Sequence, residues 1–132
     1  MLFSTDPIAD MLTRLRNAAE VRSRSASVPY SKAKLALAQV LVQAGWIANV
    51  ITHGTPPRTM VVTLKYDDQG RSIIRSIRRV SRPGRRIYVG HLNLPIVANN
   101  FGLAVISTPQ GMMTNREARR RKLGGEVICE VF

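Results

Sequence analysis

Apolar residues recur every three or four positions near the start of the chain: Ile8, Met11, Leu12, Leu15 and Ala19. This spacing places them on one face of a helix, with charged and polar residues elsewhere on the wheel. Either Thr5 or Asp6 can cap that helix, and Pro7 suits its first turn. The pattern predicts an amphipathic helix that extends to about Arg22.

Alternating apolar and polar residues predict two strands further along, at 25–30 and 59–66. Pro29 places the first strand at an edge of its sheet or ends it there. Between them, the Ala-, Leu- and Val-rich run 34–44 predicts a helix that Ser31 caps and Gly45 ends, and 46–50 predicts a strand. The whole stretch 35–57 carries no formal charge, but its amides and prolines suit a core helix and strand better than a membrane span.

The segment 72–80 fits two patterns. Ile73, Ile77 and Val80 have helical spacing, whereas the β-branched content and the turn at 81–84 favour a strand. We expect the strand, with 85–89 returning beside it as a hairpin.

Short elements are expected in the last third of the chain: a helix from 93–95 to Gly102, a strand at 103–108, a helix at 115–122 capped by Thr114, and a strand at 126–132 after Gly124-Gly125. The turn at 67–70 marks a boundary. A chain of 132 residues therefore forms one domain, or two small lobes that share a core.

The charge changes this picture most. Twenty Lys and Arg oppose eight Asp and Glu, which gives a net charge of +12, and 16 of the 20 basic residues are Arg. The planar guanidinium grips phosphate in a bidentate way and stacks on bases, so this bias favours a nucleic-acid partner. The plainer alternative is a basic domain without such a partner.

Residues that support catalysis are sparse. His53 and His91 are isolated, Asp67-Asp68 lie in a predicted turn, and no metal-ligand or phosphate-loop motif occurs. The lone Cys129 lies in an apolar run and is expected to be a buried thiol in a reducing compartment. The first ten residues lack the features of a signal peptide. We therefore expect no enzyme activity, cofactor, metal or small-molecule substrate, although a small nuclease or RNA-modifying enzyme remains the alternative.

Two stretches are suited to RNA. The segment 71–90 contains seven Arg and no acid: Arg71, Arg75, Arg78, Arg79, Arg82, Arg85 and Arg86. As a hairpin it would present an arginine row to phosphates and Tyr88 to a base, whereas the alternative is a solvated strand face. The second stretch, 107–114, predicts a polar loop before the start of a basic helix that carries Arg116 and Arg120.

Three separated blocks of sequence resemble the bacterial small-subunit ribosomal protein eight family. They are Asp-Pro-Ile-Ala-Asp-Met-Leu-Thr-Arg at 6–14 with Arg-Asn at 16–17, Arg-Val-Ser-Arg-Pro-Gly at 79–84 with Arg-Ile-Tyr at 86–88, and a tail. The tail block comprises Gly102, Ser107-Thr108, Gly111, Met113-Thr114, Glu117-Ala118-Arg119 and Gly124-Gly125-Glu126. The blocks keep one order and span nearly the whole chain.

The resemblance implies an α+β protein of two small lobes packed together. The N-terminal lobe, 1–66, would be mixed α/β, and the C-terminal, RNA-binding lobe, 67–132, would be mostly β with short helices. It also implies a structural constituent of the small ribosomal subunit that binds the central domain of 16S ribosomal RNA and is needed for subunit assembly and translation. Its other partners would be neighbouring small-subunit ribosomal proteins, and no membrane is expected.

Carried over by motif position, the RNA contacts would be Ser107, Thr108, Gly111, Met113, Thr114, Tyr88, Gly124, Gly125 and Glu126. Arg82, Arg86, Arg116 and Arg120 join them as expected phosphate contacts. Glu126 would brace the loop or accept from a base or a 2′-hydroxyl. Many relatives have a third hydroxyl where this chain has Pro109, which removes one possible hydrogen bond and stiffens the loop. The ribosome would be that of a bacterial cytoplasm or, for a plastid-encoded chain, of the organelle stroma. A DNA-architectural protein is the remaining alternative.

Overall fold

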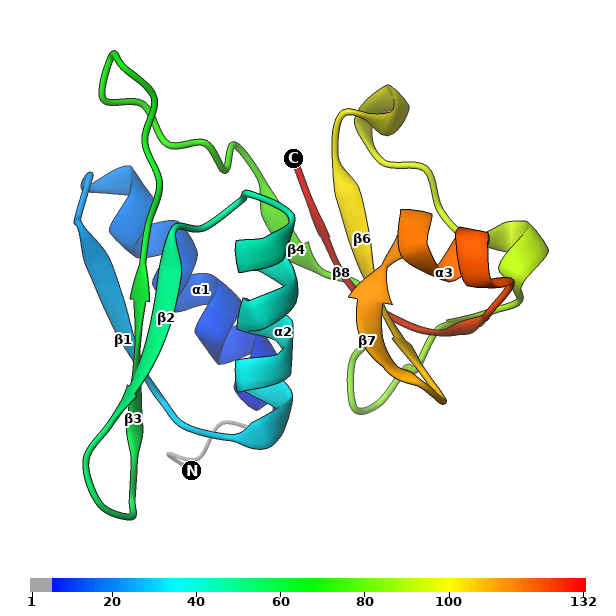
Figure 1. Ribbon diagram of the computed structural model, residues 1–132, viewed down its shortest axis with the longest axis horizontal. Helices are drawn as coiled ribbons and strands as arrows, with labels where there is room; N and C mark the ends of the chain where they lie inside the picture. The colour runs from blue at the N-terminus through cyan, green and yellow to red at the C-terminus, as the bar shows by residue number, and fades with distance from the viewer. Residues whose placement is uncertain (1–5) are drawn as a thin grey trace. The chain divides into compact units, whose positions relative to one another are not determined.

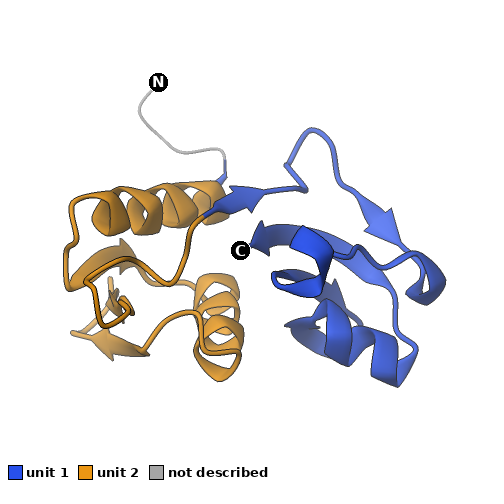
Figure 2. Ribbon diagram, turned by 90° about the horizontal axis from the view of Figure 1, so that it is seen from above, with its two compact units in different colours: residues 1–6, 76–132 blue, residues 7–75 orange. Residues whose placement is uncertain are grey.

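The computed structural model of the protein describes residues 6–132, so the proposed cap Thr5 lies outside it. The described residues form two compact units, 7–75 and 76–132, and Asp6 belongs with the second (Figure 2). Each unit has its own antiparallel sheet and at least one helix, so the protein is α+β, as expected. The division into lobes 1–66 and 67–132, with RNA binding assigned to the second, stays a prediction.

The 7–75 unit consists of two helices and a three-stranded sheet (Figure 1). Its elements are α1 (Pro7–Glu20), β1 (Ser25–Pro29), α2 (Lys32–Gln43), β2 (Asn49–His53) and β3 (Thr59–Thr63). The strand order is β1-β3-β2, and both pairings are antiparallel. The buried side chains of α1 and α2 pack against the inward rows of the sheet, and the opposite face, where Ser27, Val61 and Ile51 form one row, is more exposed.

Local signals of this unit agree with the sequence predictions. Met11, Leu12 and Leu15 on α1 are fully buried, as the helical spacing predicts. The Ser31 hydroxyl accepts from the Lys34 N–H at 3.1 Å and caps α2. Pro29 ends β1, which is an edge strand, where a residue without an N–H is tolerated.

The 76–132 unit is mostly β. It contains β4 (Ile77–Arg79), β5 (Tyr88–Val89), the 3-10 turns η1 (His91–Asn93) and η2 (Ala98–Asn100), β6 (Leu103–Thr108), β7 (Gly111–Thr114), α3 (Asn115–Arg121) and β8 (Gly125–Val131). The sheet order is β4-β8-β6-β7 (Figure 1). Strand β5 also pairs with β8. Strand β8 therefore pairs with three other strands, β4, β5 and β6.

One face of this sheet carries a hydrophobic core under α3. Leu94, Val97, Ala104, Ile106, Met113, Ala118 and Val127 are all buried there. Asn115, fully buried at the start of α3, fixes the helix by donating to Pro95 O at 2.8 Å and accepting from Ala104 N–H at 3.3 Å. These two bonds tie α3 to both the 3-10 segment and β6.

The predicted hairpin of 72–80 with 85–89 is wrong. Only Ile77–Arg79 of the first segment is a strand, and β4 and β5 pair with different parts of β8, not with each other. The turn at 81–84 is present and is closed by reciprocal backbone hydrogen bonds between Arg82 and Arg85. The residues before the turn and those after it both form backbone hydrogen bonds with β8. Sequence alternation alone did not reveal which strand was the partner.

Smaller differences have local causes. The strand predicted at 46–50 lies at Asn49–His53, because the Trp46 and Ile47 N–H groups bond back to Leu41 O and finish the turn after α2. The strand predicted at 59–66 ends at Thr63. The helix predicted from 93–95 to Gly102 is not formed: η1 ends at Asn93, and within the predicted range only η2 is helical, as a 3-10 turn whose residues all have positive φ. The loop predicted at 107–114 is the β6–β7 hairpin.

Candidate nucleic-acid interface

Three of the expected RNA-contact residues form one row across the 76–132 sheet. Glu126 on β8 lies directly opposite Tyr88 on β5 and opposite Ser107 on β6, and Met112 on β7 continues the row. Directly opposed residues project from the same face of a sheet. The next row, Val127, Ile106 and Met113, belongs to the core beneath α3, so the Tyr88 row projects from the other face.

Chemically, the row combines an aromatic ring, a carboxylate and a hydroxyl. Tyr88 is 69% exposed, whereas Ser107 and Glu126 are partly buried. The ring can stack on a base, and the carboxylate and hydroxyl can hydrogen-bond to base edges or 2′-hydroxyls. The row therefore has groups for recognising RNA other than by its phosphate charge.

Two glycines allow the strands of the row to approach closely. A Cβ on Gly125 would lie 2.0 Å from Ser107 O, and one on Gly124 would lie 2.4 Å from Val89 O. No side chain fits at either position without moving backbone. Gly124 and Gly125 therefore allow this part of the chain to approach β5 and β6 closely, which is a structural reason for glycine at both positions.

Hydrogen bonds hold the Glu126 carboxylate in place. Its Oε2 accepts from the Ser81 hydroxyl at 2.6 Å and from the Arg86 guanidinium at 3.0 Å. Burial acts to raise the pKa of Glu126, but those two bonds, together with the positive charges of Arg86 and Arg79, outweigh it and lower the pKa below its usual value. Glu126 is therefore an anion at neutral pH, with its charge largely directed at Arg86.

Acid is expected to weaken this network. The Glu126 pKa is lower in the folded than in the unfolded protein, so the group stabilises the fold above its ordinary pKa near 4.5 and loses that contribution as the pH falls through the folded value. At pH 6 we expect the wild type to exceed Glu126→Gln in free energy of unfolding by roughly 1–2 kcal/mol, and the gap to shrink by pH 3. Urea unfolding at both pH values measures this, and a gap independent of pH would contradict the assignment.

Other expected contact residues build the β6–β7 hairpin. Thr108 and Gly111 are paired across a turn made by Pro109 and Gln110. The Thr108 hydroxyl donates to Gly111 O at 2.8 Å and accepts from Gln110 N–H at 3.1 Å, and Gly111 has φ +112°, which favours glycine. These bonds fix the turn beside the Tyr88 row.

Met113 and Thr114 both have structural roles in the 76–132 unit. The Met113 side chain is only 7% exposed and packs in the core. The Thr114 hydroxyl accepts from Glu117 N–H at 3.1 Å and caps α3, as its sequence context predicts. In this structure neither side chain is presented to solvent in the way Tyr88 is.

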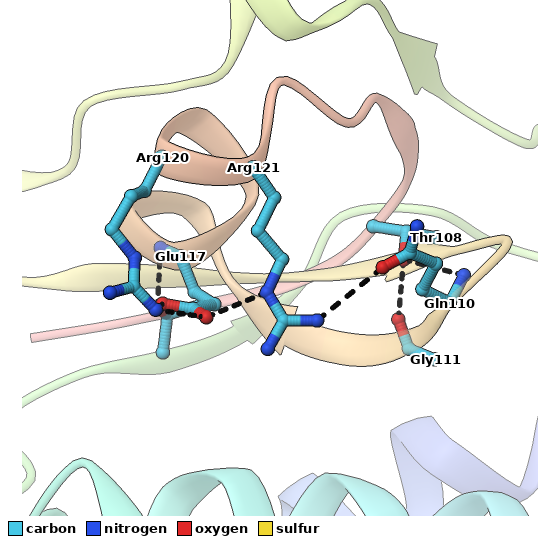
Figure 3. Close-up of polar contacts among 7 residues, drawn as sticks. Thr108, Gln110, Gly111, Glu117, Arg120 and Arg121 are labelled. Carbon is cyan, nitrogen blue, oxygen red and sulfur yellow. Dashed lines mark hydrogen bonds and ion pairs between the residues drawn. The ribbon is translucent and has the colours of Figure 1, made fainter.

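Two cations of α3, Arg120 and Arg121, lie around one acid (Figure 3). Glu117 contacts the guanidinium of Arg120 at 2.5 Å and that of Arg121 at 2.7 Å, and Arg121 reaches Gln110 of the hairpin turn at 3.4 Å. These ion pairs lower the pKa of Glu117. Arg116 donates instead to Asn100 O. Helix α3 covers the core face, so Arg116 and Arg120 are not part of the Tyr88 row.

The predicted row of seven uncompensated arginines is wrong. Four have acidic partners: Arg71 with Asp67 at 3.2 Å, Arg78 with Glu130 at 2.6 Å, Arg79 with Asp6 at 3.0 Å and Arg86 with Glu126 at 3.0 Å. Arg79 is nearly buried and also donates to Ile128 O, so it is a structural residue. Within 6–132, Arg75, Arg82 and Arg85 are exposed and form no ion pair, and of the expected phosphate contacts only Arg82 is among them.

One important residue was overlooked as a site residue. The sequence indicates Ser81 only as part of a turn, yet its buried hydroxyl contacts Glu126. A serine before Arg-Pro-Gly is ordinary turn chemistry, so the sequence held no separate signal for this role.

Asp67 is explained by turn chemistry: its carboxylate accepts from the Gln69 and Arg71 N–H groups.

Other kinds of site find little support in the part of the chain that is described. Residues 6–132 contain no group of three His, Cys, Asp or Glu side chains placed to hold a metal ion. None of the helices in that range has the length and apolar character needed to cross a bilayer. Burial raises the pKa of Cys129 to about 12, so this thiol is protonated and unreactive at neutral pH.

Comparisons with known proteins identify the family of the chain. The family model described as "Ribosomal protein S8" matches residues 6–132. Proteins named "Small ribosomal subunit protein uS8" are similar over almost their full lengths. The one from Sorangium cellulosum is 50% identical over 129 residues, covering 97% of this chain and 98% of the relative. Those from Acidithiobacillus ferrooxidans and Roseiflexus castenholzii are 52% and 47% identical, each covering 96% of this chain and 97% of the relative. The chain belongs to the ribosomal protein S8 family.

Proposed function

We propose that the protein is a structural, non-enzymatic constituent of the small ribosomal subunit that binds the central domain of 16S ribosomal RNA. The observation that carries this proposal is the row of Tyr88, Glu126 and Ser107 on the sheet face opposite α3. Family membership supports the ribosomal role. In this proposal the protein acts early, and its RNA contact is needed for subunit assembly and so for translation.

In this proposal two kinds of contact bind the RNA: contacts that recognise its shape and contacts to its phosphates. The row, with the Thr108–Gly111 turn beside it, recognises the shape of one irregular RNA helix. Arg82, Arg86, Arg116 and Arg120 contribute contacts to phosphate, whose strength depends on salt. Gly124, Gly125, Met113 and Thr114 support the row by close packing, core burial and helix capping.

The site of action is the ribosome, in a bacterial cytoplasm or in the stroma of a plastid, with neighbouring small-subunit proteins as further partners. The wide distribution of positive charge suits such a setting. Ten basic residues lie in 7–75 and ten in 76–132, so both units can meet RNA phosphates.

A binding measurement tests this function. A fragment of the 16S central domain and a structured control RNA of equal length are titrated with the protein at about 50 and 200 mM salt. We expect a preference for the fragment of at least roughly a hundredfold that persists at the higher salt, since shape contacts are not screened as phosphate contacts are. Equal binding to both RNAs, lost together as salt rises, would show a generic cationic surface and contradict the proposal.

A further inference from the structure

Ser81 is a fully buried hydroxyl at the back of the proposed RNA face. It follows β4, and its backbone N–H bonds to Val127 O at 3.1 Å. Its hydroxyl accepts from the Ile87 N–H at 2.9 Å and donates to Glu126 Oε2 at 2.6 Å. A serine has one hydroxyl proton, and Ser81 donates that proton to this carboxylate.

The carboxylate is held from one side only. Ser81 and Arg86 both bind Oε2, and residues 6–132 supply no hydrogen-bond donor to Oε1. A carboxylate has about four acceptor positions, so Oε1 keeps its capacity to accept. It is free to receive a hydrogen bond from a 2′-hydroxyl or from an amino group of a base.

The two donors to Glu126, Ser81 and Arg86, differ in how firmly their own side chains are fixed. The Arg86 side chain is 47% exposed, on a long flexible stem, and a nearby phosphate can compete for its guanidinium. Ser81 is 0% exposed and is anchored through both its backbone and its hydroxyl. When RNA engages Arg86, Ser81 still fixes the carboxylate.

We propose that Ser81 is a positioning residue that aims Glu126 at the RNA, keeping Oε1 in the row between Tyr88 and Ser107. The inference rests on the proposed function, because it assumes that this row faces RNA. It makes RNA specificity depend on a side chain that the RNA never touches. Ser81 also links the 81–87 excursion to β8, so one hydroxyl sets both the path of the chain and the direction of the carboxylate.

A double-mutant cycle on RNA affinity tests the positioning role. Ser81→Ala is expected to weaken binding to the 16S central-domain fragment about tenfold, the fold-change of one charge-assisted hydrogen bond, and to change binding to the control RNA less than about twofold. In a Glu126→Ala background the same change should have a clearly smaller effect on the fragment, since the group that Ser81 positions is gone and only the hydrogen bond from the Ile87 N–H is lost. Equal losses in both backgrounds, or on both RNAs, would overturn the inference.

A second readout does not involve RNA. In Ser81→Ala, carbon-13 NMR titration of the Glu126 carboxyl should show a higher pKa than in the wild type, because one donor to the anion is lost while Arg86 and Arg79 remain. An unchanged pKa would overturn the inference. Should Ser81→Ala fail to fold, Ser81→Cys places a slightly larger group with a poor donor at the same position, and its expected losses are the same. Wild-type behaviour of that variant would overturn the inference.

The experiment separates the two levels of the proposal. A wild-type protein without preference for the fragment contradicts the proposed function. A wild-type preference that Ser81→Ala leaves unchanged contradicts only the positioning role of Ser81.

Discussion

Replacing Gly125 with alanine is expected to destabilise the 76–132 unit by about 3 kcal/mol, the upper end of what overpacking usually costs. A Cβ there would lie 2.0 Å from Ser107 O, 2.8 Å from Ser107 C and 3.1 Å from Thr108 Cα. All three atoms are backbone, so no side chain can rotate away to make room. Strands β6 and β8 must separate locally, although they are the two central strands of the sheet.

The same change is expected to weaken binding to the 16S fragment roughly tenfold or more even at temperatures where the variant is folded. Ser107 and Glu126 face each other across the gap that the new methyl group would widen. Hydrogen exchange of the β8 amides reports the stability of this unit separately from that of 7–75, and RNA titration reports the binding.

Gly90→Ala is the matched control. Gly90 has an extended backbone, with φ −78° and ψ 167°, and a Cβ there meets no atom within 4 Å. Its stability is expected to stay within about 0.5 kcal/mol of the wild type. A Gly125→Ala protein with wild-type exchange rates would show that β6 and β8 are not so closely paired at this point.

Local features of the fold were predictable because their causes are local. The spacing of Met11, Leu12 and Leu15 predicts the buried face of α1, and Ser31 and Thr114 predict helix starts through hydrogen bonds that span three residues. Each signal lies within one or two turns of the element it defines. Propensity and capping are therefore enough to find it.

Strand partners were not predictable in the same way. Alternation in 77–89 is consistent with a hairpin, but β4 and β5 both pair with β8, whose paired residues lie 36 to 54 positions away along the chain. Pairing of that kind depends on the whole sheet. The β6–β7 hairpin was missed because Ser107 to Thr114 is rich in small polar residues, which suit a loop equally well.

The candidate site was likewise predictable only in part. The family resemblance pointed to Tyr88, Ser107 and Glu126, which lie side by side in the structure although they are separated in the sequence. Composition alone pointed to an uncompensated arginine row, but the acids that neutralise much of it lie far along the chain, as with Arg86 and Glu126. Counting charges within a segment does not reveal partners that folding brings from elsewhere.

Tyr88→Ala is expected to cost about 1–3 kcal/mol of binding to the 16S fragment, or roughly 5- to 150-fold in affinity, if the ring stacks on a base. The ring is 69% exposed, so its loss should barely change the stability of the protein. Tyr88→Phe keeps the stacking surface and removes only the hydroxyl, so it should retain most of the affinity. Both variants are measured by RNA titration alongside their unfolding free energies.

Two controls identify the origin of the loss. Leu92 is also an exposed apolar residue of the 76–132 unit, at 85%, but it lies in η1 and outside the row, so Leu92→Ala should leave affinity within about twofold. Arg120→Ala removes a cation of α3 and should weaken the fragment and the control RNA by similar factors.

Comparing the affinities for the 16S fragment and the control RNA distinguishes the two kinds of contact. A shape contact lowers the ratio of the two affinities, whereas a phosphate contact lowers both affinities and leaves their ratio unchanged. We therefore expect Tyr88→Ala to reduce the preference for the 16S fragment and Arg120→Ala to preserve it. If Tyr88→Ala weakened both RNAs equally, the exposed ring would be only one more part of a nonspecific surface. Recognition would then have to be sought elsewhere than on the face that Tyr88, Glu126 and Ser107 share.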